Sequence, residues 1–187
     1  MSWRFYVILL LGFSLIGTSC EKDDEEFPMG VQLPDSVEFG KSEIYRNGEF
    51  IDYERRFFHW KETSVHKHFT YSFFLQQEID LWHSFRFNWL PADTGFFKID
   101  RPGVMYETAS AGITQGFDED LIGYSYELLD KEDGFIHITH LDTLEMTVKG
   151  NFEVKFVRTS KNGNRQDLGL PKYLYFQGVF YENYQIP

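Results

Sequence analysis

Apolar and polar residues alternate with a period of two along most of the chain beyond residue 36. The pattern is clearest in HFTYSFFL (68–75), in WHSFRFNWL (82–90), between residues 143 and 157, and in YLYFQGVFY (173–181). A period of two is typical of β-strands that bury one face, and no segment has the period of a helix of three turns. The chain is therefore predicted to fold as antiparallel strands.

Segments 68–75 and 82–90 predict a hairpin with one apolar and one polar face. Pairing them places Phe73 opposite Phe85 and Tyr71 opposite Phe87 on the buried face, where the alternation also puts Trp89. The other face combines a flat ring with hydrogen-bonding groups, which suits sugar binding. Its residues are Trp82, Arg86, Asn88, Ser72 and His68.

Glycines predict how the strands turn and bend. Asn47-Gly48 lies between two short strand-like runs, and both residue types accept the positive φ of a tight hairpin turn. The alternation over 143–157 is long for one strand, so Gly150 in its middle predicts a bend or bulge. Residues 91–123 alternate least and are predicted to be irregular.

Aromatic residues make up 19% of the chain, with 20 Phe and 11 Tyr, and this enrichment favours strands around a core of rings. The prediction is an all-β fold of about eight to ten strands. Two architectures fit it: an antiparallel barrel of the lipocalin or calycin type, and a two-sheet sandwich.

The N-terminus has the pattern of a secretory signal. Arg4 precedes the apolar run FYVILLLGFSLIG, which is too short to span a bilayer comfortably and ends in the small residues Thr18 and Ser19. Cys20, the only cysteine in the chain, follows directly.

This junction resembles the lipobox of bacterial lipoproteins, in which the cysteine becomes the first mature residue and carries the lipid. Gly17 stands where the lipobox usually has Leu, and this looser form is similar to lipoproteins of Bacteroidetes-type bacteria. Many of those carry a Lys followed by acidic residues as an export signal, and here Lys22 precedes the run 23–26. The resemblance implies a lipid on Cys20 and a place on the outer membrane, at the cell surface or on its periplasmic face.

The C-terminal half is similar to small lipoproteins of unknown function from the same bacteria. Their pattern has an I-x-x-x-D segment, a strand ending in Gly-x-Phe, and a Pro-led strand ending in Gly-x-Phe. It matches Ile138 and Asp142, Gly150 and Phe152, then Pro171, Gly178 and Phe180. The resemblance implies fold and location and brings no catalytic residue with it.

Three segments follow from these patterns: a signal peptide over 1–19, a lipidated Cys20 with an acidic, flexible tether over 20–36, and a single β domain over 37–187. The mature length suits one domain with a sizeable core. The 16 residues after the cysteine would reach at most about 50 Å when fully extended.

The formal net charge is −11, which disfavours nucleic-acid binding because that requires clustered Lys and Arg. An acidic exterior also leaves membrane attachment to the lipid. The sequence predicts no cofactor, metal site or catalytic residue, and it lacks the motifs of known nucleophiles and phosphate loops. His66 and His68 share one strand face, whereas His137 and His140 point to opposite faces if their segment is extended.

These observations predict a surface-displayed, lipid-anchored binding or interaction protein whose ligand is a glycan or a small apolar molecule. One alternative is a metal-dependent hydrolase that uses His66 and His68. Another is a structural accessory subunit of an envelope complex, so an envelope protein is a further candidate partner.

Overall fold

The computed structural model describes residues 26–53, 55–62, 67–76, 81–100, 109–117, 120–121, 124–129, 134–161 and 171–185. Within these ranges every regular element is a strand, which confirms the all-β prediction. The strands are β1 (Lys41–Arg46), β2 (Glu49–Phe50), β3 (Arg55–Glu62), β4 (Lys67–Gln76), β5 (Leu81–Pro91), β6 (Gly95–Lys98), β7 (Ser110–Phe117), β8 (Asp120–Leu121), β9 (Tyr124–Leu128), β10 (Phe135–Asp142), β11 (Thr147–Lys161) and β12 (Tyr173–Gln185).

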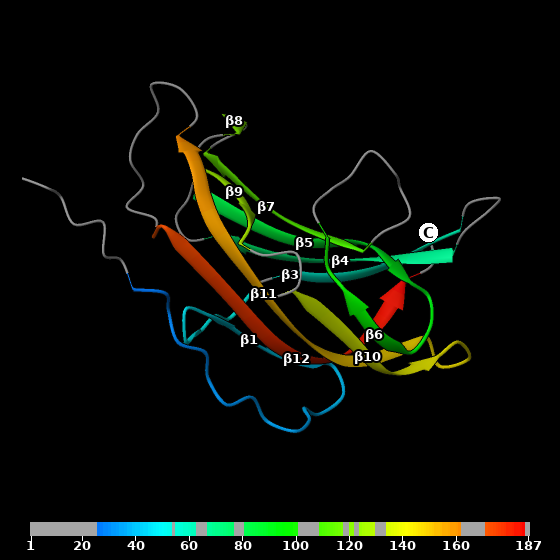
Figure 1. The fold of residues 1–187 in the computed structure, drawn as a ribbon. Helices are drawn as coiled ribbons and strands as arrows, with labels where there is room; N and C mark the ends of the chain where they lie inside the picture. The colour runs from blue at the N-terminus through cyan, green and yellow to red at the C-terminus, as the bar shows by residue number, and fades with distance from the viewer. Residues whose placement is uncertain are drawn as a thin grey trace, which may run out of the picture.

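The strands form one curled, mostly antiparallel sheet (Figure 1). Its order is β6-β10-β11-β12-β3-β4-β5-β7-β8, with β1 beside β12, β2 beside β1 and β9 beside β11. Only the β12–β3 pairing among these described strands is parallel, and it is short: Tyr184 pairs with Phe58 and Gln185 with His59.

This short contact divides the sheet into two antiparallel blocks. We name them the β12 block (β1, β2, β6 and β9–β12) and the β4 block (β3–β5, β7 and β8). The path through the described strands ends at β6 and at β8. Just beyond β6, Asp100 forms an isolated parallel bridge with Ser110 of β7, and its N–H donates to the Ala109 carbonyl at 2.8 Å. In the described part of the chain the sheet is therefore strongly curled, and this single bridge links the β6 end to the β4 block.

The two blocks face each other across a core of aromatic rings. Phe85 of the β4 block stacks on Phe176 of the β12 block, with 4.6 Å between the ring centroids and 7° between the ring planes. The rings of Tyr71 and Phe180 also meet across the core, with centroids 4.9 Å apart and planes tilted by 56°. Buried ring pairs of this kind contribute strongly to stability, so the aromatic enrichment of the sequence serves mainly the core.

The β4–β5 hairpin has the predicted register. Phe73 pairs with Phe85 and Tyr71 with Phe87, and all four side chains are buried. This agreement follows from the period of two, because a slip of one residue would expose every one of these rings.

The predicted turn between β1 and β2 is also present. Asn47 and Gly48 have φ of 54° and 84°, the two positive values of a type I′ turn. The Asn47 side chain additionally fastens this turn to β12, because its Oδ1 accepts a hydrogen bond from the Tyr175 N–H at 2.7 Å and its Nδ2 donates to the Tyr173 carbonyl at 3.1 Å.

Strand β11 begins at Thr147, later than the alternation predicts. Asp142 Oδ1 accepts hydrogen bonds from the N–H groups of Leu144 and Glu145, at 2.8 and 2.9 Å, and these bonds hold the preceding residues in a turn. Leu144 and Met146 continue the apolar alternation but are 89% and 43% exposed. The prediction fails here because a local bond from a side chain to the backbone competes with strand pairing.

The segment before β1 lies against the outer face of β12. The ring of Phe27 lies 5.3 Å from that of Tyr173 and 5.8 Å from that of Tyr175. The Val31 N–H donates to Gln177 Oε1 at 2.8 Å. Tyr175 and Gln177 are therefore buried, although they alternate with the core residues of β12.

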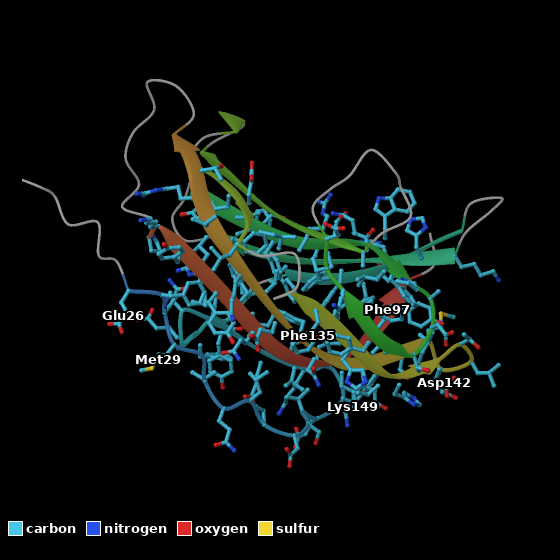
Figure 2. All side chains as sticks on the ribbon, in the orientation of Figure 1. Glu26, Met29, Phe97, Phe135, Asp142 and Lys149 are labelled. Atoms are coloured by element: carbon cyan, nitrogen blue, oxygen red, sulfur yellow. The ribbon has the colours of Figure 1, made fainter. Side chains whose placement is uncertain are left out.

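These contacts place residues 26–31 against the β domain, whereas the sequence analysis assigns them to the tether. Figure 2 shows Glu26 and Met29 on the side of the molecule where β12 begins, and Asp142 at the opposite side. The predicted signal peptide and Cys20 lie outside the described residues. In the described ranges, no helix combines the length and the apolar character needed to cross a bilayer.

Candidate ligand-binding face

The outer face of the β4–β5 hairpin is centred on Arg86. Ser72 pairs directly with Arg86, as the predicted register requires, and Arg86 Nε donates a hydrogen bond to Ser72 Oγ at 3.1 Å. Arg86 is nevertheless exposed. The bond to Ser72 orients the guanidinium and leaves the terminal amino groups of Arg86 without a hydrogen bond to any described residue.

A β-bulge interrupts the hairpin beyond Arg86. The register changes between the pairs Tyr71–Phe87 and Phe69–Leu90, so Asn88 and Trp89 share a single opposite residue on β4. Trp89 has a φ of 58°, which is rare for a bulky residue and marks the bulge.

The bulge turns Trp89 away from the core. The sequence analysis places Trp89 on the buried face, and this prediction is wrong: Leu90 is the buried residue there. The indole of Trp89 instead stacks on the ring of His68, with 4.2 Å between centroids and 30° between planes. An alternation of two cannot anticipate this arrangement, because a bulge inserts one residue into the count.

His68 lies on the predicted face but beneath its surface. It is 5% exposed and forms one side of the stack with Trp89. His68 therefore supports the indole, and the half-buried Trp89 presents an aromatic ring at this end of the face, while the half-buried Phe74 lies beyond Ser72 on the same face of β4. Trp82 belongs to β5, but its side chain lies outside the described residues, so its role stays a prediction.

Strand β7 extends the face on the other side of β5. Asn88 pairs with Ser110 and Arg86 with Gly112. Among the described residues, no atom lies within 4 Å of the position that a Cβ would take on Gly112, so they leave the sheet surface beside Arg86 open. We call this surface the polar face; its described members are Thr70, Ser72, Arg86, Asn88, Trp89 and Gly112.

The sequence analysis missed the contribution of β7. Residues 110–117 have the sequence SAGITQGF, in which small residues hide the alternation, so the pattern predicts an irregular segment here. In the structure it pairs with β5 from Leu81 to Asn88. Backbone pairing with a strongly patterned neighbour extends this strand through Ala111 and Gly112, where no apolar alternation marks it.

Histidines elsewhere are arranged differently from the prediction. β10 has a bulge between Ile138 and His140, so His140 pairs with Lys149 while His137 pairs with Asn151. Both histidines thus lie on the outer face, which overturns the prediction that they point to opposite faces. Even so, the described part of the chain contains no group of three His, Cys, Asp or Glu side chains able to hold a metal ion. His66 lies outside the described residues.

Comparisons with known proteins give no identification: no family model, no curated protein and no solved structure matches this chain.

Proposed function

We propose that this protein is a lipid-anchored binding protein that presents the polar face to a glycan. The observation that carries the proposal is the arrangement around Trp89, an indole backed by the buried His68 and placed beside Asn88 on a bulge. A rigid ring next to hydrogen-bonding side chains is the chemistry that binds sugars, since the ring packs on the C–H groups and the polar groups bind the hydroxyls.

Two side chains of the polar face support hydrogen bonding to hydroxyl groups. Asn88 and Thr70 are half-buried and make no side-chain hydrogen bond to another described residue. Asn88 offers both donors and an acceptor, and Thr70 offers a hydroxyl. Arg86 and Asn88 stand two residues apart along the strand, about 7 Å, so one oligosaccharide can contact both.

The filled core favours an outer site over a site inside a barrel. Phe73 and Phe87 of the β4 block contact Phe152 of the β12 block, with ring centroids 5.5 and 5.0 Å apart. A small apolar ligand in the mouth of a lipocalin-like barrel would need space where these rings lie. We therefore assign the ligand to the polar face and choose the glycan of the two ligand classes.

The lipid anchor is proposed from the N-terminal sequence and places the protein on the outer membrane, at the cell surface or on its periplasmic face. Metabolic labelling with a palmitate analogue tests it. We expect label on the wild-type chain and none on a Cys20→Ser variant. Equal labelling of the two chains would refute the anchor and leave the glycan site to be judged separately.

A glycan array probed with the detergent-solubilised full-length protein tests the binding function. We expect retention on a subset of glycans, and a loss of at least about tenfold in affinity for Trp89→Ala, because the stacking ring is removed. Phe96→Ala is the matched control, since Phe96 is 58% exposed and its ring contacts Phe135 and His137 of β10, not a member of the polar face. Absence of any retained glycan, or equal losses in both variants, would overturn the proposal.

A further inference from the structure

The three strands that form the polar face contain no acidic residue. β4, β5 and β7 are 10, 11 and 8 residues long and include no Asp or Glu. The whole chain, by contrast, has 29 acidic residues among 187. Of the basic residues in these strands, Arg86 is exposed on the polar face, whereas Lys67 lies on the other face of β4, opposite Glu62 of β3. Arg86 therefore gives the polar face a positive charge on a protein that is strongly anionic.

One described carboxylate, that of Asp100, belongs to a residue at the edge of this surface. Asp100 forms an isolated bridge with Ser110, and Ser110 is the β7 residue that pairs with Asn88. Arg86 lies two residues further along β5, opposite Gly112. No described side chain forms a salt bridge with Arg86, so its charge is available to a ligand.

The surroundings of Arg86 suit a planar anion. Ser72 holds its Nε at 3.1 Å, which fixes the plane of the guanidinium. Gly112 has no side chain, and no described residue has an atom within 4 Å of its Cβ position, so the described part of the chain allows a ligand to approach from the β7 side. A guanidinium with free terminal amino groups binds a carboxylate through two parallel hydrogen bonds, a geometry that an ammonium cannot match.

We infer that the glycan bound by the polar face carries a carboxylate, as in hexuronates and sialosides, and that Arg86 binds this carboxylate. The inference rests on the proposed glycan-binding function. Trp89 then stacks on a sugar ring, Asn88 binds hydroxyl groups, and Arg86 selects acidic sugars over neutral ones. The absence of Asp and Glu from the three strands removes the repulsion that an acidic ligand would otherwise meet.

An array of carboxylated oligosaccharides, each printed beside its carboxyl-reduced counterpart, tests the inference with the full-length protein in detergent. We expect each retained acidic glycan to bind about tenfold more tightly than its reduced form in low salt. The difference should shrink as NaCl rises to about 0.5 M, because salt screens the ion pair.

Variants of Arg86 separate charge from hydrogen-bonding geometry. Arg86→Gln should abolish the preference for the acidic form and change binding of the reduced form by less than about twofold. Arg86→Lys should keep only part of the preference, since Lys retains the charge without the paired hydrogen bonds. Lys98→Gln, an exposed cation on β6 of the β12 block, is the control and should leave the preference intact.

The outcomes distinguish this inference from the proposed function. Equal binding of acidic and reduced glycans, with dependence on Trp89, would overturn the carboxylate assignment and leave glycan binding standing. Retention of sulfated glycans in place of carboxylated ones would also overturn it. A failure to retain any glycan would overturn both proposals.

Discussion

Two glycines in the middle of the β12 block lie directly opposite phenylalanines on the neighbouring strand. Gly150 pairs with Phe180, and Gly178 pairs with Phe152. A Cβ on Gly178 would come within 2.7 Å of the Phe152 ring, and one on Gly150 would meet the His137 carbonyl oxygen at 2.2 Å. Each ring therefore covers a glycine, which keeps the strands close and shields the backbone where no side chain is present.

Gly178→Ala should consequently destabilise the protein by about 1–3 kcal/mol, because the added methyl group overpacks a filled core. Chemical denaturation monitored by circular dichroism measures the change. Gly112→Ala is the matched control: it also replaces a strand glycine, but no atom of the described residues lies within 4 Å of the new Cβ. The control should be neutral or should stabilise by about 0.5–1 kcal/mol, since alanine restricts the unfolded chain. Equal losses for both variants would contradict the packing account.

Single residues also mark where prediction from the sequence ends. The inward positions of Phe152, Phe176 and Phe180 follow from the alternation, and the structure buries all three. The outward position of Trp89 does not follow from it, because the bulge that turns this residue depends on how β4 and β5 pair. Of the two stacked residues in the candidate site, the alternation predicts the face on which His68 lies but not the face on which Trp89 lies.

Among the elements, the β10–β11 hairpin depends on one carboxylate. The Asp142 side chain accepts hydrogen bonds from two backbone N–H groups in the turn, and these bonds hold the pKa of Asp142 below its usual value. A carboxyl whose folded-state pKa is lowered stabilises the fold above its unfolded pKa, near 3.8. That contribution is lost as the pH falls through the lower, folded-state pKa.

The difference in unfolding free energy between the wild type and Asp142→Ala should therefore be larger at pH 6 than at pH 2.5. Denaturant unfolding at the two pH values measures it. Asp142→Asn is a useful second variant, because an amide oxygen still accepts the bonds but does not titrate. A difference that is independent of pH would show that the ionised carboxylate contributes nothing to the turn.

The N-terminal segment is a second element whose role depends on tertiary contacts. Phe27 packs between Tyr173 and Tyr175, and Lys155 Nζ lies 5.6 Å from the centroid of the Phe27 ring. The acidic composition that precedes Phe27 predicts a tether, and composition alone gives no sign that a single ring fastens its end to β12.

Phe27→Ala should release this segment and lower stability by about 1 kcal/mol, through the loss of the aromatic contacts. Hydrogen exchange of the Val31 amide, which is bonded to Gln177, should become faster. Met29→Ala removes a side chain that is 87% exposed and should leave the exchange rate unchanged. A Phe27→Ala variant with wild-type exchange at Val31 would show that Phe27 does not hold the segment.

Across the whole molecule, the segment that precedes β1 and the polar face lie on opposite sides of the core. Residues 26–31 cover the outer face of β12, and the polar face is the outer face of the other block. If Cys20 carries a lipid, the seven residues from it to Phe27 span at most about 25 Å. The β12 side would then lie towards the membrane, and the polar face would point away from it, accessible to ligands.

The all-β class and the central register were predictable, because long amphipathic strands determine both, whereas the structure has one curled sheet of 12 described strands where the sequence predicts a barrel or a two-sheet sandwich of about eight to ten. The curl that sets β12 beside β3 was not, since a parallel contact of two residue pairs carries no local sequence signal. The cationic character of the polar face also became visible only when β4, β5 and β7 were found side by side.

The most direct test of the account is to locate the bound glycan by ¹H–¹⁵N spectroscopy of the detergent-solubilised full-length protein. The best-retained oligosaccharide of the array is the titrant. We expect the indole N–H of Trp89, the Nε–H of Arg86 and the backbone amides of Asn88 and Gly112 to shift together with one dissociation constant. Shifts confined to the β12 block, or no shift on the polar face at saturation, would contradict the account.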